Sequence, residues 1–270
     1  MSSVILITGA AGGIGSALAR QAWQAGFRVL ATDLRPEGLE ALRLELQAGP
    51  ERWASLPHDI RSAEDWQAAL GLAQARFGRL DILVNNAGYI RPGYPGTTTV
   101  EDIDLHLDIN VKGMMLGTLL AVPVMRAQGG GHLINLASLA GVAPIPGLDL
   151  YSASKFAVRA YSLATAQELR QHGIAVSVVC PDAVDTPMLT LQQAYDEASV
   201  TFSAPRFLQA DEVAGIILRR VIPRRPLEVM IPAHRGLTAR IANLFPGLMG
   251  LIRAQLVRRG RRRRLARSGS

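Results

Sequence analysis

Residues 8–15 read Thr-Gly-Ala-Ala-Gly-Gly-Ile-Gly, and they lie between an apolar run at residues 4–7 and a segment of helical periodicity that starts at residue 14. Glycines at a strand-to-helix turn let the backbone turn tightly and approach a pyrophosphate. The N-terminus of the following helix would then face the phosphate charge. A glycine-rich loop alone is weak evidence, but its place between a strand and a helix favours a dinucleotide site over an ordinary tight turn.

Outward from this loop, apolar runs alternate with segments of helical periodicity. Most of the runs are continuous, as in strands that are covered on both faces. The alternation implies right-handed βαβ units, so the sequence predicts an α/β, Rossmann-like, doubly wound fold with a parallel seven-stranded sheet and helices on both faces. The predicted strands cover residues 4–8, 27–33, 53–58, 80–85, 131–137, 174–180 and 227–231. The predicted helices cover residues 14–25, 37–48, 62–77, 100–127, 151–171 and 211–221, with Ser62 and Asp211 as N-caps.

The chain divides into a predicted dinucleotide-binding catalytic domain, residues 1–235, and a basic, amphipathic helical tail, residues 236–270. Residues 187–210 carry no strand signal, and in such a fold this insert lies beyond the carboxyl ends of the strands, where ligands bind. Apolar residues recur at helical spacing through the tail. Pro246 interrupts them, which predicts two short helices or one kinked helix.

The net charge of +7 belongs to the tail, because residues 250–270 contain eight arginines and no acid. Three interpretations of the tail stay open: packing on the body or on a second subunit, contact with an anionic membrane surface, and nucleic-acid binding. Nucleic acid is disfavoured, because the run lacks interleaved aromatics and matches no nucleic-acid module. The N-terminus does not resemble a signal peptide, and no uninterrupted apolar run reaches the ~18 residues of a membrane span. We therefore expect a cytoplasmic protein, peripheral on a membrane at most.

No metal site is expected from the sequence. The single cysteine, Cys180, excludes an intramolecular disulfide and gives no support for a cysteine-based metal site. The five histidines show no metal-ligand spacing, and each is interpreted as a surface or packing residue.

Asp33 ends the second predicted strand. A carboxylate there can accept hydrogen bonds from both ribose hydroxyls of NAD and would repel the 2′-phosphate of NADP. A helix-capping or loop aspartate is the plainer alternative. Arg35 complicates the choice, because its guanidinium could contact a phosphate. NAD is nonetheless favoured over NADP.

Residues 151–155 read Tyr-Ser-Ala-Ser-Lys at the start of a predicted helix. Positions i and i+4 share one face, so Tyr151 and Lys155 can point into the same cleft. A phenol of pKa ~10 is a poor base at neutral pH. A neighbouring ammonium and a positively charged nicotinamide would lower that pKa. Ser138, at the end of the fifth predicted strand, could hydrogen-bond the reacting oxygen. Taken singly, each of these residues also has an ordinary structural interpretation.

Over about residues 3–232, the chain resembles the short-chain dehydrogenases/reductases of the compact type. The matching motifs occur in the order of that family, which makes the joint match far more specific than any one motif. They are the TGxxxGxG loop (Thr8, Gly9, Gly13, Gly15), Asp33, Asp59-Ile60, Asn85-Asn86-Ala87-Gly88, Asn110, Ser138 and Tyr151-x-x-x-Lys155.

The resemblance implies a role for each of four catalytic residues. Tyr151 would be the general acid/base, and Lys155 would hold the nicotinamide ribose and depress the Tyr151 pKa. Ser138 would orient the substrate oxygen. Asn110 would anchor a water that links Lys155 to solvent.

It also implies a set of cofactor-binding residues. Gly9, Gly13, Ile14 and Gly15 would cradle the pyrophosphate, Asp59 and Ile60 would contact the adenine, and Asn86, Ala87 and Gly88 would lie at the central ribose region. Val184 and Thr186 would meet the nicotinamide carboxamide. One residue departs from the family pattern: Asp182 stands where the family usually has glycine. Aspartate takes glycine-like backbone angles less readily, so the loop would be reshaped, or Asp182 would itself face the substrate.

The expected activity is that of an NAD(P)-dependent oxidoreductase, NAD-linked, that interconverts a lipophilic secondary alcohol and its ketone. Two alternatives are an NADPH-dependent carbonyl or 3-oxoacyl reductase of the same fold and a non-catalytic, membrane-recruited dinucleotide-binding protein. Members of the family commonly form homo-oligomers through their fourth and fifth helices, so a homo-oligomer is expected here.

Overall fold

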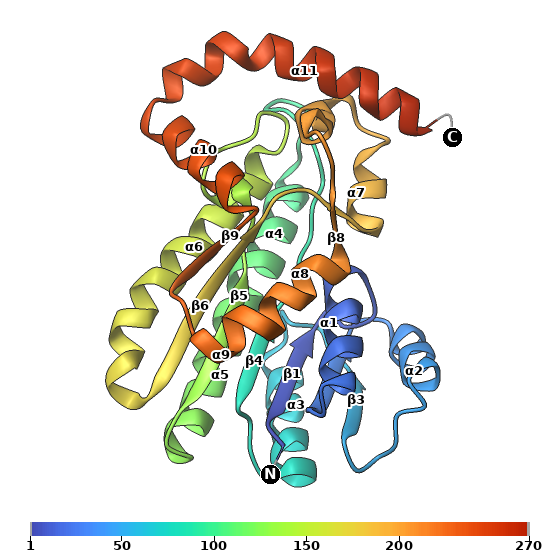
Figure 1. Ribbon diagram of the computed structural model, residues 1–270, viewed down its shortest axis with the longest axis vertical. Helices are drawn as coiled ribbons and strands as arrows, with labels where there is room; N and C mark the ends of the chain where they lie inside the picture. The colour runs from blue at the N-terminus through green and yellow to red at the C-terminus, as the bar shows by residue number, and fades with distance from the viewer. Residues whose placement is uncertain (1, 269–270) are drawn as a thin grey trace.

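Seven parallel strands form the central sheet of the computed structural model, in the order β3-β2-β1-β4-β5-β6-β9 (Figure 1). The structure describes the backbone of residues 2–268 and the side chains of residues 2–247 and 254–267. The strands are β1 (Val4–Thr8), β2 (Arg28–Asp33), β3 (Trp53–Pro57), β4 (Ile82–Asn85), β5 (Gly131–Leu136), β6 (Ile174–Pro181) and β9 (Glu228–Ile231). This arrangement confirms the predicted doubly wound α/β fold.

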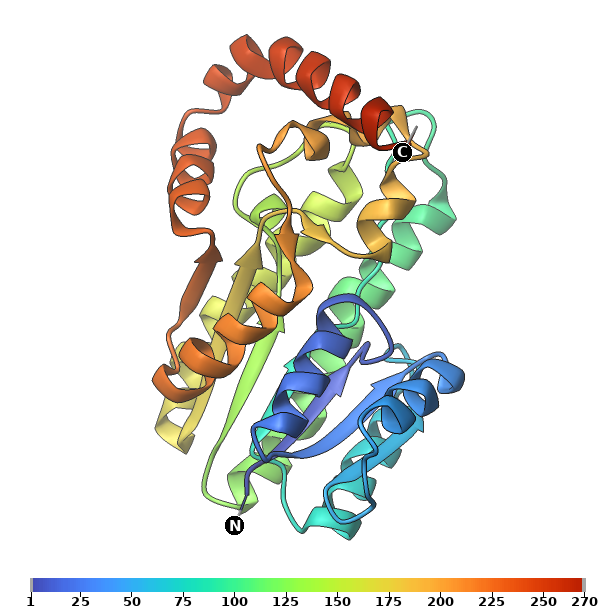
Figure 2. The same ribbon diagram turned by 45° about the vertical axis from the view of Figure 1, so that its right-hand side comes forward.

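Helices cover both faces of the sheet, as the continuous apolar strands require. They are α1 (Gly13–Gln24), α2 (Pro36–Glu45), α3 (Ala63–Phe77), α4 (Val100–Leu107), α5 (Met114–Ala127), α6 (Asp149–Leu169), α8 (Ala210–Ile216) and α9 (Ile222–Arg224). One core cluster joins the sheet to α1, α2 and α8, and a second joins it to α3, α5 and α6. Figure 2 shows α1 and α8 side by side on one face. The strands are thus buried between two helical layers.

The predicted elements match the observed ones closely, with corrections at an N-cap and inside two helices; the predicted helix at residues 211–221 ends in the π-helical segment η5 (Ile217–Val221). Ser62 caps α3 as predicted, because its hydroxyl accepts from Asp65 N at 3.0 Å. The N-cap of α8 is Gln209 rather than Asp211, which lies in the first turn. The predicted helix at residues 100–127 contains a π-helical segment, η1 (Asp108–Gly113), between α4 and α5.

A lid covers the carboxyl edge of the sheet. It consists of α7 (Pro187–Gln192) and the 3₁₀ segment η4 (Asp196–Ser203), and it corresponds to the insert predicted at residues 187–210. The insert also contains a strand that the sequence did not indicate, β8 (Leu208–Gln209), which pairs in parallel with β7 (Val184–Asp185). This two-stranded sheet holds both ends of the lid above the main sheet.

The tail forms two helices, α10 (Ala233–Leu244) and α11 (Pro246–Ser268). Pro246 begins α11, where a missing N–H removes no helical hydrogen bond. The predicted division at residues 235 and 236 falls inside α10. In Figures 1 and 2, α11 crosses the top of the molecule above the lid, and it contacts η4.

By length and composition alone, the continuous helical stretch Val100–Ala127 could cross a membrane. The core helix of a globular domain passes the same test, so this is weak evidence for a span. The stretch carries Asn110, and its C-terminal part packs against α3.

Candidate active site

One cavity of about 750 Å³ runs along the carboxyl edge of the sheet, from the glycine loop to α10. It brings together the candidate residues from both halves of the fold, at the edge where ligands bind in open α/β sheets. The candidate residues that line it are Gly9, Gly13, Ile14, Asp33, Asp59, Ile60, Asn86, Ala87, Gly88, Ser138, Tyr151, Lys155, Val184 and Thr186. Gly15 and Asn110 lie behind its wall.

The glycine loop is shaped by close backbone contacts. Gly9 and Gly13 have left-handed backbone angles, with φ of +66° and +53°. A Cβ at Gly15 would lie 2.0 Å from the Gly9 carbonyl oxygen, so a side chain at this position cannot fit. The Asn86 amide donates to the Thr8 carbonyl at 2.9 Å. Asn86 therefore fixes the loop to the end of β4, which is a positioning contact in addition to its place in the cavity wall.

The Asp33 carboxylate is held at the cavity wall by backbone donors. Ala11 N donates to Oδ2 at 2.9 Å, and Arg35 N donates to Oδ1 at 3.0 Å. The Asp33 side chain is only 9% exposed, whereas that of Arg35 is 66% exposed. The carboxylate is thus fixed in place, and the guanidinium beside it lies largely in solvent.

The loop after β3 is held by Trp66, whose indole N–H donates to the Ile60 carbonyl at 2.9 Å. The Asp59 carboxylate pairs with Arg61 at 2.6 Å. His58 lines the cavity beside them, and burial lowers the pKa of its imidazole to about 4. No metal-ligand or catalytic spacing in the sequence includes His58, so sequence reasoning did not single it out.

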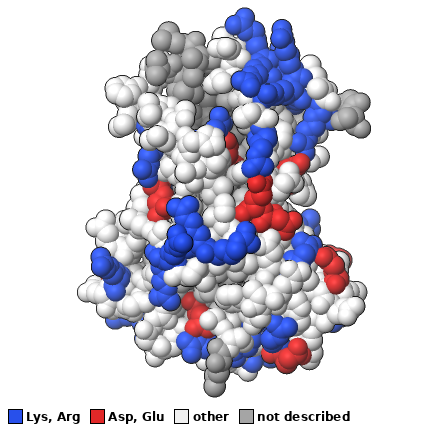
Figure 3. Space-filling model, in the orientation of Figure 1, with Lys and Arg blue, Asp and Glu red and all other residues white. Residues whose placement is uncertain are grey.

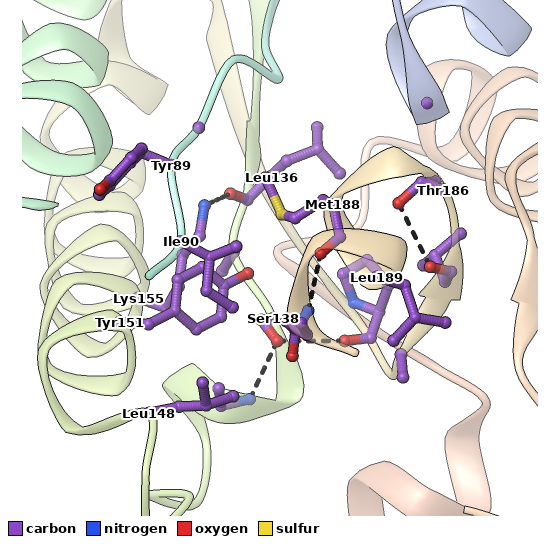
Figure 4. A pocket seen from close by; sticks show the side chains of 18 of the residues that line it. Tyr89, Ile90, Leu136, Ser138, Leu148, Tyr151, Lys155, Thr186, Met188 and Leu189 are labelled. Carbon is purple, nitrogen blue, oxygen red and sulfur yellow. Dashed lines mark hydrogen bonds between the residues drawn. The ribbon is translucent and has the colours of Figure 1, made fainter. Parts of the chain in front are cut away.

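Tyr151 and Lys155 lie one turn apart on α6 and face the same space as Ser138 (Figure 4). The Lys155 Nζ is 5.6 Å from the centroid of the Tyr151 ring and donates to the Leu136 carbonyl at 2.9 Å. The Ser138 hydroxyl lies beside the Tyr151 phenol and donates to the Pro181 carbonyl at 3.5 Å. It also accepts from Ala140 N at 3.1 Å, which fixes its direction. The periodicity of α6 thus places Tyr151 and Lys155 together as predicted, and the chain after β5 places Ser138 beside them.

Burial shifts the pKa values of both Tyr151 and Lys155. It raises the pKa of Tyr151 to about 12, and the neighbouring Ser138 hydroxyl only partly opposes this shift. It lowers the pKa of Lys155 to about 8. In the protein by itself, desolvation by burial is the largest cause of the Tyr151 shift. The expectation that the Lys155 ammonium depresses the Tyr151 pKa stays a prediction.

Asn110 lies in the π-helical segment η1, and its amide is fully engaged. Its Oδ1 accepts from Tyr89 N at 2.7 Å, and its Nδ2 donates to the Tyr89 carbonyl and to Ser154 Oγ, both at 2.9 Å. A Cβ at Gly88 would lie 3.2 Å from Asn110 Oδ1 and 3.5 Å from Lys155 Nζ. Asn110 thus joins η1 to the loop beside Lys155, and its role in anchoring a water stays a prediction.

Asp182 does not distort the loop after β6. Among the described residues, the only non-glycine residues with left-handed backbone angles are Gln47 and Arg225. The Asp182 N–H donates to the Ile231 carbonyl at 2.7 Å, and its carboxylate accepts from Arg235 Nε at 2.7 Å. Arg235, on α10, also lines the cavity. Val184 and Thr186 line the cavity as well, and their contact with the nicotinamide carboxamide stays a prediction. Arg235 is a residue that the sequence did not single out.

The far half of the cavity, beyond Ser138 and Tyr151, is mainly apolar. Within the described residues, no group of three His, Cys, Asp or Glu side chains could hold a metal ion. The apolar lining here includes Ile90, Leu139, Ile145, Leu148, Met188 and Leu189. This space suits an organic substrate with apolar substituents.

A doubly wound sheet, a glycine loop and a Ser–Tyr–Lys group in one cavity define the class of a dinucleotide-dependent oxidoreductase. The short chain dehydrogenase family model matches residues 3–196. The chain belongs to this family, whose members are NAD(P)-dependent. It is an enzyme that acts on alcohol or ketone groups.

Two relatives and one solved structure illustrate the similarity. The 2-(R)-hydroxypropyl-CoM dehydrogenase of Xanthobacter autotrophicus is 36% identical over 192 residues, which cover 70% of this chain and 77% of the relative. The 3-oxoacyl-[acyl-carrier-protein] reductase FabG of Thermotoga maritima is 33% identical over 217 residues, covering 80% and 88%. A short chain dehydrogenase/reductase from Burkholderia phymatum, solved in complex with NAD, shares the fold with a TM-score of 0.83 at 24% identity, covering 92% of this chain and 95% of its own.

Replacing Lys155 by methionine should remove a pH dependence of stability. Burial lowers the Lys155 pKa from 10.5 to about 8, so between these values the unfolded chain binds one more proton than the folded protein. Stability of the wild type should therefore rise with pH above about 8. The raised pKa values of Cys180 and Tyr151 act in the opposite direction, above pH 9 and pH 10 respectively. Urea unfolding of Lys155→Met between pH 7 and 9 should lack the rise.

The exposed lysine Lys112 supplies the matched control. Lys112→Met should keep the rise in unfolding free energy seen in the wild type. An identical rise in Lys155→Met would contradict the assignment of this pH dependence to the buried ammonium.

Proposed function

We propose that this chain is an NAD-linked dehydrogenase that interconverts a lipophilic secondary alcohol and its ketone. The observation that carries the proposal is the convergence of Tyr151, Ser138 and Lys155 on a cavity that continues to the glycine loop. The mainly apolar walls beyond these residues favour a lipophilic substrate. By their names, one relative is a dehydrogenase of a hydroxypropyl compound and the other a reductase of 3-oxoacyl groups. Both names are compatible with an alcohol or ketone as the substrate.

The residues present fit a nicotinamide dinucleotide. Gly9, Gly13 and Gly15 lie so close to neighbouring atoms that a Cβ at these positions would be crowded. The side-chain-free backbone of this loop suits a pyrophosphate at the start of α1. When bound, the nicotinamide supplies the site that gives or accepts hydride. Asp33 would hold the adenosine ribose, and Val184 and Thr186 would border the carboxamide, as family members do at the matching positions.

Tyr151 handles the proton in this proposal. With a pKa of about 12 in the protein alone, its phenol keeps its proton at neutral pH and can donate it to a ketone oxygen. In the oxidation direction the phenol must lose its proton. A cationic nicotinamide next to it favours the phenolate and opposes the effect of burial. Ser138, oriented by Ala140 N, would hold the same substrate oxygen.

Lys155 would pass the proton between the Tyr151 phenol and solvent. Its lowered pKa, about 8, allows the ammonium to release a proton at a pH near neutrality. The bond to the Leu136 carbonyl keeps Nζ beside the Tyr151 ring. Asn110, on η1 behind Gly88, would anchor the water that continues the path to solvent.

Tyr151→Phe should lower kcat by about 100-fold or more, the low end of what a positioned acid or base contributes. The phenylalanine ring keeps the packing of α6 while it removes the hydroxyl. NADH affinity, followed by fluorescence titration, should be unchanged. Activity near that of the wild type would remove Tyr151 from its proposed role.

The carboxylate of Asp33 supports NAD as the cofactor. A 2′-phosphate at this position would face a negative charge that is held by Ala11 N and Arg35 N. We expect the wild type to bind NADH about tenfold more tightly than NADPH, a difference of about 1.4 kcal/mol. Asp33→Asn, which keeps the shape but removes the charge, should narrow that ratio in paired fluorescence titrations.

Glu37→Gln is the control for this experiment, because it removes a charge from the first turn of α2 without touching the cavity. It should keep the preference of the wild type. A wild type that prefers NADPH would instead favour the alternative, an NADPH-dependent carbonyl or 3-oxoacyl reductase, with Arg35 as the phosphate contact.

A homo-oligomer is also part of the proposal. Exposed apolar side chains follow α4, η1 and α5, among them Leu107 (46% exposed) and Leu119 (64% exposed). With Val111 and Met115 they border a shallow apolar hollow beside Tyr161 of α6. A second copy of the chain would cover this surface, and a monomeric mass in light scattering would contradict this assembly.

A membrane surface stays a second hypothesis for the tail. Leu237, Ile241 and Leu244 of α10 are exposed, and so are Arg258 and Arg259 of α11. An apolar stripe beside arginines suits anionic lipid. Co-sedimentation with phosphatidylserine vesicles tests this contact, and a protein that stays in the supernatant would exclude it. Leu248, Ile252 and Arg253, which belong to the predicted amphipathic pattern, lie outside the described side chains.

A further inference from the structure

One face of α10 forms a wall of the cavity. Arg235, Thr238, Ala239 and Ala242 line it, and their spacing of three, four and seven residues places them on the same side of the helix. Leu256 of α11 lines it as well. These residues lie beyond residue 196, where the match to the family model ends. The tail therefore contributes to the substrate end of the cavity.

Ion pairs anchor α10 to the catalytic body at two points. Arg235 pairs with Asp182, the residue that departs from the family pattern, at 2.7 Å. Arg240 pairs with Glu228 of β9 at 2.5 Å, and Glu228 also holds Arg159 of α6. The aspartate that departs from the family pattern and α10 thus contact each other. This ion pair helps to place α10 against the cavity.

The backbone of α11 lies directly on the lid. A Cβ at Gly260 would lie 1.7 Å from the Ser199 carbonyl oxygen, so only glycine allows this approach. Arg264, 7% exposed, donates to the Gln193 carbonyl at 3.1 Å and pairs with Asp196. Arg263 donates to the Ser203 carbonyl at 3.1 Å. These contacts hold η4 along its length.

The arginines of α11 are divided between two faces of the helix. Leu256, Gly260, Arg263, Arg264 and Arg267 recur at helical spacing and face the body, where Arg267 pairs with Asp185 and stacks over Phe207 at 5.1 Å. The exposed Arg258, Arg259 and Arg262 lie on the other face. Arg261 is also exposed, and it pairs with Asp196 of η4 at 2.7 Å. Lys and Arg side chains gather above the lid, over the C-terminal half of α11 (Figure 3). The inward arginines are thus part of the packing of the protein.

The opposite side of the same lid faces the cavity. Met188 and Leu189 of α7, and Val200 and Thr201 of η4, line it. The lid therefore lies between the cavity and α11, as the position of α11 above η4 in Figures 1 and 2 shows. Ala198 and Phe202 of η4 are buried in an apolar cluster with Leu189, and partly buried Ala183, Tyr195 and Phe207 pack against it. The polar contacts to α11 add to this apolar anchor.

We propose that α10 and α11 are specificity-determining parts of the substrate site: Ala242 and Leu256 limit the apolar chain of the substrate, and α11 holds the lid against that chain. This proposal rests on the proposed function. The ligand class is a secondary alcohol or ketone whose apolar substituent extends from the Tyr151–Ser138 oxygen site toward the tail. The small side chains Ala239 and Ala242 leave room for such a chain, and Leu256 closes the space above it.

The first test changes the wall. We would measure kcat/KM for the 2-alkanols from 2-propanol to 2-undecanol with NAD. Ala242→Phe should lower kcat/KM for the long alkanols at least tenfold and leave that for 2-propanol unchanged, through KM rather than kcat. Leu256→Ala should shift the optimum to longer chains. Asn243→Phe, at the neighbouring exposed position, is the control and should match the wild type.

The second test changes the contact between α11 and the lid and needs no substrate. Arg264→Met should increase backbone hydrogen exchange in residues 196–203 at least tenfold, because η4 loses the ion pair and the hydrogen bond that Arg264 supplies. Arg259→Met, at an exposed position of the same helix, should exchange as the wild type does. NADH affinity should be equal in both variants.

The outcomes separate this inference from the proposed function. If the wild type oxidises no 2-alkanol at any length, the proposed substrate class fails, and hydrogen exchange alone decides the contact with the lid. If the wild type is active and Ala242→Phe and Leu256→Ala keep its chain-length profile, the tail is no part of the substrate site. If Arg264→Met leaves hydrogen exchange in residues 196–203 unchanged, the claim that α11 stabilises the lid is wrong.

Discussion

The buried ammonium of Lys155 is the constraint on which the rest of the site depends. It donates to one carbonyl, that of Leu136 at the end of β5, and so ties α6 to the sheet edge next to Ser138. A charged group removed from water needs such a partner, and here the cost of burial is also seen in a pKa lowered to about 8. Because Tyr151 lies one turn earlier, the same contact fixes the phenol against Ser138. The contact that packs α6 against the sheet therefore also sets the geometry of the proposed catalytic residues.

Much of this arrangement could be predicted from the sequence, because it follows from local rules. Continuous apolar runs gave the strands, and the glycines at residues 9, 13 and 15 gave the turn before α1. The spacing of Tyr151 and Lys155 gave their common face. The end of β5 gave the place of Ser138. In each case the relevant interaction lies within one element or at the end of one strand, where sequence order decides which side chains can meet.

The remainder depends on contacts between distant segments, which no periodicity encodes. The pair of Asp182 and Arg235 joins residues 53 positions apart, and the departure at residue 182 became intelligible only when its partner was seen. The docking of α11 on η4 depends on Gly260, whose need for close approach is visible only beside the Ser199 carbonyl. The raised Tyr151 pKa reflects the desolvation of the phenol in the cavity wall, and a neighbouring positive charge alone suggested the opposite direction.

The central claim is that a nicotinamide ring binds next to the Tyr151 phenol in the cavity that starts at the glycine loop. Nuclear Overhauser measurements on the protein with NAD test this most directly. The account predicts magnetisation transfer between the nicotinamide H4 proton and the ring protons of Tyr151. Bound NAD whose nicotinamide protons show contacts elsewhere on the protein and none to Tyr151 would contradict it.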